Sequence, residues 1–288
     1  MATIQWYPGH MAKAKRLIRE KLPLVDLVFE LRDARIPVAS ANPLLAEIIQ
    51  DKPRLVLFNK ADLADPVETN RFLARAAQSG LVALAINSLT ENPLPQILEK
   101  SHGILVHRWE KEAKKGMKSR PIRALVVGIP NVGKSQLINR LAGQAKAKTG
   151  DRPGVTTTQT FLRAGSQLEL MDNPGILWPK FESQDVGIRL ALVGSIKDDL
   201  LPLDEVVIQG LTLLAKRYPK ALRERYGLSE KSLKDPLAML TEIGKNRGCL
   251  LPGGLIDVER VYTLFLHDLR HQKIGRLTLE SADDDVSI

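Results

Sequence analysis

Residues Gly128–Ser135 read Gly-Ile-Pro-Asn-Val-Gly-Lys-Ser, which is the spacing of a phosphate-binding loop. The two glycines let backbone N–H groups close around phosphate oxygens, and a helix that starts at the loop adds positive potential. Lys134 is expected to reach the β- and γ-phosphates, and Ser135 to coordinate Mg²⁺. An apolar run precedes the loop and a helix-like run, Gln136–Ala142, follows it. This context predicts a nucleotide site.

A second motif, Asn59-Lys60-Ala61-Asp62, lies about seventy residues before the loop. A carboxylate at Asp62 can accept hydrogen bonds from N1–H and the 2-amino group of guanine, whereas adenine has no donors there. Lys60 can lie along the base. Alone, the motif could be a turn in which Asp62 caps a helix; beside a phosphate loop it indicates guanine selection. Asn87-Ser88-Leu89 is placed to close the other side of the base.

Two further segments have the character of nucleotide-sensing switches. Asp172 of Asp172-Asn173-Pro174-Gly175 is expected to hold Mg²⁺ through water, and the N–H of Gly175 to meet the γ-phosphate. Thr156 is the expected switch threonine, with Thr157 and Thr158 as alternatives. Ile176 stands where Ras-like enzymes have a glutamine that orients the attacking water. Hydrolysis must therefore be slow, use another group, or depend on a partner.

Apolar runs of strand length alternate with helix-like segments such as Glu68–Gln78 and Pro95–Ser101. These runs are Leu24–Leu31, Leu55–Phe58, Leu81–Ile86, Ile122–Val127 and Leu168–Met171. The alternation predicts an α/β fold with a mostly parallel sheet, and ligands bind beyond the carboxyl ends of such strands. The charged segment His107–Arg120 is expected to be a connection. Because the guanine-reading motif precedes the phosphate loop and does not follow it, this connection would join the last and first elements of a fold in which the motifs stand in the usual order.

After about Pro179 strand signals end and helical spacing takes over. The pattern predicts helices through Val206–Tyr218, through Leu237–Gly244 and through Val258–Leu269, the last with Asp257 near its start. The expected organisation is a nucleotide-binding domain at 1–180, a helical domain at 181–280, and a frayed acidic tail at 281–288.

The charge is distributed unevenly. The chain has 288 residues and a net charge of +9. Residues 1–196 hold 28 Lys and Arg against 18 Asp and Glu, and the rest hold 14 against 15. The clusters Lys13–Lys21, Arg108–Arg123 and Lys146–Arg152 favour a nucleic-acid partner and salt-sensitive binding, although a solvated basic surface is the simpler alternative.

Cysteine and apolar content bear on the compartment. The single cysteine, Cys249, excludes an internal disulfide. No apolar stretch reaches the length of a membrane span, and the amino terminus lacks an apolar signal core. The basic stretch Met11–Leu22 could imitate a transit peptide, but cleavage would remove the motif-like Trp6–His10 before it. A reducing compartment, the cytoplasm, is expected.

Taken together, the motifs resemble those of the ribosome biogenesis GTPase A (YlqF) family, whose P-loop GTPase fold is circularly permuted (motif order G4-G5-G1-G2-G3). The resemblance spans nearly the whole chain. Its motifs are Trp6–Met11, Arg32–Pro37, Asn59–Asp62, Gly128–Ser135, Asp151–Thr156, Asp172–Pro179, Arg247-Gly248, Pro252–Gly254 and Asp257. One departure is Asn173, where many relatives have threonine.

The resemblance implies a GTPase that assembles the large (50S) ribosomal subunit, is stimulated by the immature particle, and carries a C-terminal RNA-binding helical domain. It implies that His10 replaces the missing glutamine, or else is structural, and that Asn131 helps to hold K⁺. Two alternatives stay open: an RNA-binding scaffold that uses GTP as a slow switch, and a GTPase acting on tRNA or in membrane traffic.

The expected site follows from both lines of reasoning. Catalytic roles are expected for His10, Lys134, Thr156 and Gly175. Nucleotide contacts are expected from Asn59, Lys60, Asp62, Asn87, Ser88, Asn131, Val132, Gly133, Lys134, Ser135, Gln136, Thr156 and Gly175. Ser135, Thr156 and Asp172 are the expected Mg²⁺ ligands, the last through water. The expected cofactors are Mg²⁺ and K⁺ with GTP or GDP, and the expected partner is a large-subunit precursor, with no membrane and no DNA.

Overall fold

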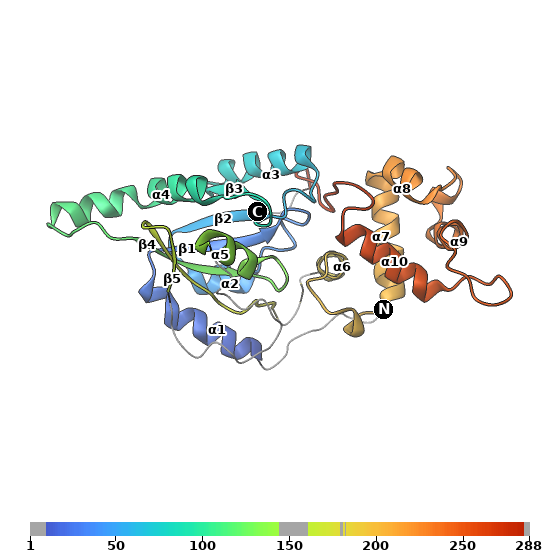
Figure 1. Cartoon of the computed structure of the whole chain (residues 1–288), viewed down its shortest axis with the longest axis horizontal. Helices are drawn as coiled ribbons and strands as arrows, with labels where there is room; N and C mark the ends of the chain where they lie inside the picture. The colour runs from blue at the N-terminus through green and yellow to red at the C-terminus, as the bar shows by residue number, and fades with distance from the viewer. Residues whose placement is uncertain (1–9, 144–160, 179–180, 182, 285–288) are drawn as a thin grey trace.

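The computed structural model describes residues 10–143, 161–178, 181 and 183–284. A sheet with helices on both sides forms one part of the molecule, and a bundle of helices forms the other (Figure 1). None of the helices in these described ranges combines the length and apolar character of a membrane span.

The sheet has six strands in the order β3-β2-β1-β4-β6-β5. The strands are β1 Leu27–Asp33, β2 Arg54–Asn59, β3 Ala83–Ala85, β4 Ile122–Gly128, β5 Leu162–Ala164 and β6 Leu168–Met171. All neighbours pair in parallel except β5 and β6, which are antiparallel. The predicted mostly parallel sheet is confirmed, and β5 is an edge strand that the sequence did not reveal.

Alternate side chains of the central strands pack on opposite faces, as the pleat requires. Val56 and Phe58 of β2 form a small cluster with Phe72 of α3 (Pro66–Gln78), whereas Leu55 and Leu57 belong to the main core. The other helices around the sheet are α1 His10–Lys21, with the 3₁₀ turn η1 Leu22–Leu24, then α2 Pro43–Ile49, α4 Leu94–Lys114 and α5 Lys134–Ala142.

The helical part contains the three expected helices and two that were not expected. The expected ones are α7 Leu203–Arg217, α9 Pro236–Asn246 and α10 Val258–Arg270, and the additional ones are α6 Gln184–Leu192 and α8 Pro219–Tyr226; η2 Asp198–Leu200 and η3 Ser232–Lys234 are short 3₁₀ turns. The carboxylate of Asp257 caps α10 by accepting from the N–H of Arg260 at 3.1 Å.

Three segments differ from expectation. The expected connection at His107–Arg120 is helical as far as Lys114, because Leu105 is buried against the core and Arg108 pairs with Glu112 one turn later at 2.9 Å. The last residues of the expected helical domain return to the sheet part, where the N–H of Leu277 donates to Leu63 O at 3.0 Å. The start of the tail, which was expected to be frayed, is held on α3, where Arg71 pairs with Asp283 and Arg75 donates to Ala282 O and Asp284 O.

Candidate nucleotide-binding site

The parallel strands bring the predicted motifs to one edge of the sheet. Asp33 at the end of β1 is in register with Asn59 at the end of β2, and Leu31 is in register with Gly128 at the end of β4. The loops that follow these strands therefore meet, although the chain separates them widely.

The phosphate loop ends where α5 begins. Gly133 caps that helix with φ of 100°, a left-handed conformation that glycine adopts without strain. The buried ammonium group of Lys134 donates to Ile129 O at 2.8 Å. Burial lowers the pKa of Lys134 to about 8, and the nearby Asp172 carboxylate opposes this shift. A negative phosphate beside this group would raise its pKa again and stabilise the charged ammonium.

Asn59 joins the base-reading motif to the phosphate loop. Its fully buried amide donates to Val132 O at 2.8 Å and accepts from the N–H of Ser88 at 3.2 Å. A Cβ placed on Gly133 would lie 2.3 Å from Asn59 Nδ2, so the close approach of the two motifs requires glycine. Through these hydrogen bonds, Asn59 holds the base-reading motif and the Asn87-Ser88 segment against the phosphate loop.

Lys60 makes a second bridge. It has φ of 59°, and its ammonium group donates to Asn131 O at 2.7 Å and pairs with Asp33 Oδ2 at 3.1 Å. The Asp33 carboxylate also accepts two hydrogen bonds from the guanidinium group of Arg35, from Nε at 2.9 Å and from Nη2 at 2.8 Å. Although burial favours the neutral acid, Arg35 and Lys60 hold the pKa of Asp33 well below its usual range.

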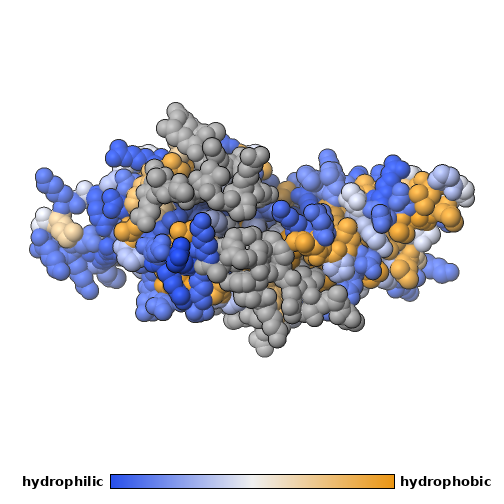
Figure 2. Space-filling model, turned by 90° about the horizontal axis from the view of Figure 1, so that it is seen from below, coloured by the Kyte–Doolittle hydropathy of each residue, from blue (hydrophilic) through white to orange (hydrophobic). Residues whose placement is uncertain are grey.

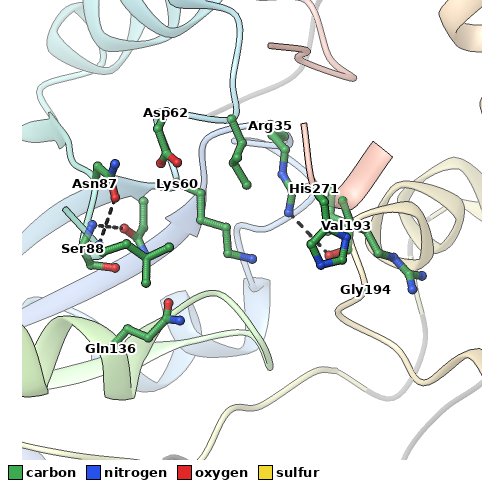
Figure 3. A pocket seen from close by; sticks show the side chains of 13 residues that line it. Arg35, Lys60, Asp62, Asn87, Ser88, Gln136, Val193, Gly194 and His271 are labelled. Atoms are coloured by element: carbon green, nitrogen blue, oxygen red, sulfur yellow. Dashed lines mark hydrogen bonds between the residues drawn. The ribbon is translucent and has the colours of Figure 1, made fainter. Parts of the chain in front are cut away.

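A cavity of about 310 Å³ lies between these loops (Figure 3). Six expected residues line it: Asn59, Lys60, Asp62, Asn87, Ser88 and Gln136. Leu89, from the expected Asn87-Ser88-Leu89 segment, also lines it, together with residues that the sequence did not suggest: Arg35, Leu63, Val193, Gly194, Arg270 and His271. Arg35 lies in the quoted Arg32–Pro37 signature, but the residues from the helical part have no local signal that would mark them.

The Asp172–Gly175 segment lies against the phosphate loop. A Cβ added to Gly175 would be 2.8 Å from Pro130 Cα and 2.9 Å from Lys134 Nζ. Burial raises the pKa of Asp172, while Lys134 lowers it. The carbonyl of Asp172 accepts from Lys21 Nζ at 2.7 Å, which fastens the end of α1 to this segment. Lys134, Asp172 and Gly175 are thus brought together.

Ile176 is held in place by hydrogen bonds of its backbone and by burial of its side chain. Its N–H donates to Gly128 O at 3.2 Å, its carbonyl accepts from the amide of Asn42 at 2.8 Å, and its side chain is fully buried. An apolar, buried side chain has no group to orient water. The other expected catalytic positions, the side chain of His10 and all of Thr156, lie outside the described residues.

Comparisons with known proteins agree with this geometry. Residues 123–224 match the family model described as 50S ribosome-binding GTPase. The chain is 50% identical over 281 residues to "Ribosome biogenesis GTPase A" of Bacillus pumilus, covering 98% of this chain and 99% of that protein. It superimposes on GNP-bound YlqF from T. maritima with a TM-score of 0.64 and 26% identity, covering 94% and 99% of the two chains. A GDP-bound structure of YlqF matches with the same TM-score and identity, over 93% of this chain and 100% of that one.

Proposed function

The chain belongs to the ribosome biogenesis GTPase A family, and from that premise we propose that it hydrolyses GTP while assembling the large ribosomal subunit in the cytoplasm. The observation that carries the proposal is the contact between two distant motifs. Lys60 and Asn59 bond directly to the phosphate loop, at Asn131 O and Val132 O, which supports one shared site for base selection and phosphate binding.

The roles of the site residues follow from their chemistry. Asp62 on the cavity wall selects guanine by accepting from its N1–H and 2-amino groups. The loop N–H groups and Lys134 bind the β- and γ-phosphates. Gly175 packs against Pro130 of the phosphate loop, which supports the proposal that its N–H meets the γ-phosphate. Thr156 is proposed to close the site from the other switch.

The donor atoms suit Mg²⁺. Ser135 offers a hydroxyl and Asp172 a carboxylate, and hard oxygen ligands of this kind, completed by phosphate and water, are what Mg²⁺ prefers. When bound, the ion neutralises charge that develops on the phosphates. The amide nitrogen of Asn131 donates to Gly194 O at 2.8 Å, which leaves its amide oxygen as the donor for K⁺.

Hydrolysis requires a water to attack the γ-phosphorus in line while the bond to the bridging oxygen of GDP breaks. Since Ile176 cannot orient that water, His10 is the proposed positioning group, and an imidazole can orient or polarise water near neutral pH. Contact with the immature particle is proposed to bring this arrangement into place and so to stimulate turnover.

The permuted order leads from Gly175 through Ile176–Ser183 directly into the helical part. We propose that the nucleotide state therefore repositions the helical RNA-binding part on the particle. The partner is a large-subunit precursor, bound through ribosomal RNA and protein, and neither a membrane nor DNA is involved.

Sedimentation with ribosomal subunits tests the proposal. The protein should co-sediment with large-subunit precursors when bound to a non-hydrolysable GTP analogue, and should be released with GDP. Lys134→Ala is the control, because a chain that cannot bind the phosphates should show no nucleotide dependence. Equal binding in both nucleotide states, or no binding to large-subunit particles, would contradict the proposal.

The buried Ile176 also favours a second function, an RNA-binding scaffold that holds GTP and seldom cleaves it. Turnover measured in potassium buffer with and without ribosomal subunits separates the two, since a scaffold stays slow in both. A pull-down that recovers tRNA in place of large-subunit RNA would support a GTPase acting on tRNA.

A further inference from the structure

The chain that follows α10 runs back across the loop that carries Asp62. We call residues 272–280 the C-terminal strap and residues 61–65 the base loop. Arg276 spans the base loop, with Nη2 donating to Ala61 O at 2.8 Å and Nε donating to Ala64 O at 2.9 Å. Every residue of the base loop is bonded to the strap, since Gln272 donates to Asp62 O, Leu277 N–H to Leu63 O, and Asp65 N–H to Thr278 Oγ1.

The strap is itself firmly held. Its apolar residues Ile274, Leu277 and Leu279 are buried in the core. Arg217 of α7 donates to Thr278 O and Glu280 O, at 3.2 and 2.8 Å. The strap therefore connects the helical part to the base loop through buried side chains and hydrogen bonds, and a support held in this way can fix a loop that it contacts.

From this geometry we infer that Arg276 is a positioning residue for guanine selection, acting on Asp62 through the backbone of the base loop. The inference rests on the proposed guanine site. The carboxylate must accept two donors of the base in the same plane, and hydrogen bonds weaken steeply when their angles change. Arg276 holds the carbonyls on both sides of Asp62, so its loss removes two of the five hydrogen bonds that position the backbone carrying the carboxylate.

An effect of Arg276 on guanine selection must be told from an effect on folding, and the burial of its partners bears on this. Arg276 is exposed, and Ala61, which accepts from its Nη2, is partly exposed, whereas Ala64, which accepts from its Nε, is buried and would lose this partner if Arg276 were removed. The loss of this partner lowers the free energy of unfolding, so the test uses a ratio of affinities that the folded fraction does not affect. A loss of base selection in a folded chain would not follow from a merely structural role.

The test compares two nucleotides on the full-length chain. The dissociation constants for GDP and for IDP, whose hypoxanthine lacks the 2-amino group, are measured by competition for wild type and Arg276→Ala. The variant is expected to bind GDP about three- to tenfold more weakly, and its preference for GDP over IDP is expected to fall by a similar factor. The ratio is independent of the folded fraction, so partial unfolding cannot imitate the result.

Two further variants sharpen the comparison. Lys273→Ala removes a neighbouring charge from the exposed surface of the strap and should leave both constants unchanged. Arg276→Lys can hold one carbonyl at a time and should retain part of the preference. An unchanged preference in Arg276→Ala would overturn the inference.

Failure of the inference can be told from failure of the proposed function. If wild type prefers GDP over IDP and Asp62→Asn abolishes the preference, the guanine site stands, and an unaffected Arg276→Ala overturns the strap role alone. If wild type shows no preference for GDP, the proposed site and the inference are both overturned.

Discussion

At the scale of single residues, the buried carboxylate of Asp33 holds two charged side chains of the cavity wall in place. Its carboxylate pairs with Lys60 and Arg35, and Lys60 also donates a hydrogen bond to Asn131 O of the phosphate loop. A buried ion pair is weak evidence for stability, but removing one partner leaves the others uncompensated. The motif Arg32–Pro37 was recognised from the sequence, whereas this role of Asp33 became visible only in three dimensions.

Asp33→Asn is therefore expected to lower the free energy of unfolding by about 3 kcal/mol at pH 7. Because the pKa of Asp33 is depressed in the folded state, this stabilisation is present above the ordinary carboxyl pKa and is lost as the pH falls. The gap between wild type and variant should shrink below about pH 4. Urea unfolding measures it, with the exposed Asp51→Asn as control. A variant as stable as wild type at pH 7 would contradict this role.

His10→Ala addresses the proposed water-orienting group. GDP affinity should stay unchanged, while particle-stimulated turnover should fall about a hundredfold, the scale of a lost general acid or base. Single-turnover hydrolysis in potassium buffer measures the effect. His10→Gln is the matched variant, since glutamine orients water in Ras-like enzymes and should restore part of the rate. Normal turnover in His10→Ala would make His10 structural.

The sequence predicted the polar residues of the cavity more completely than its full wall. Asp62, Lys60 and Gln136 belong to motifs whose spacing reflects contact with a nucleotide, so they are readable locally. Val193, Gly194 and His271 reach the cavity because the helical part packs beside it. No periodicity encodes that packing, and the sequence alone could not have found them.

At the scale of elements, burial decided which predictions were confirmed. The central strands are mostly apolar because both of their faces are covered, and the charged residues buried in β1 are paired. The edge strand β5 is three residues long and partly exposed, so it carries no such run. The polar run after His107 looked like a connection, yet most of its charged side chains are simply the solvated side of α4.

The C-terminal strap ends in a buried titratable group, Glu280, that no sequence motif marked. The Glu280 carboxylate is buried and accepts from the N–H groups of Val38 and Ala39, at 2.6 and 2.8 Å. Burial raises the pKa of Glu280 to about 7, against the opposing effect of these two hydrogen bonds. A carboxyl with a raised folded pKa binds its proton more tightly in the folded state, so ionisation destabilises the fold.

Stability should therefore fall as the pH rises from about 4.5 to 7, by an amount on the order of 3 kcal/mol from this group. Glu280→Gln cannot ionise and should flatten that slope. Urea unfolding at intervals between pH 4.5 and 8 tests it, with the exposed Glu91→Gln as the variant that keeps the wild-type slope. An unchanged slope in Glu280→Gln would show that Glu280 stays ionised throughout.

At the scale of the whole molecule, the two parts share one cavity, while a basic region lies at the opposite end. The amide of Asn131 in the phosphate loop donates to Gly194 O in the helical part. Figure 1 shows α4 extending beyond the sheet, away from the helical part, and Figure 2 shows hydrophilic residues over that end and apolar ones over much of the helical part. Arg108 and Arg120 fix that end by pairing with Asp26, just before β1.

This arrangement places the exposed lysines of α4 away from the candidate nucleotide site. Lys114 and Lys115 are exposed at the end of α4, and the structure describes no ion pair for either. Contact with phosphates would release counterions, so the affinity for ribosomal particles should fall steeply with salt. The cavity residues come from the other edge of the sheet, where these lysines do not reach.

The double variant Lys114→Ala/Lys115→Ala should therefore bind particles more weakly and lower the slope of log affinity against log salt by about 1 to 2, one counterion for each phosphate contact. Its GDP affinity should equal that of wild type. Glu110→Gln is the matched control of opposite sign, because it removes an exposed acid from the same helix and should never weaken binding. Binding by filtration at several salt concentrations measures the slope. If the double variant keeps the wild-type slope, this end of α4 only solvates the protein, and the salt-sensitive contacts lie elsewhere on the molecule.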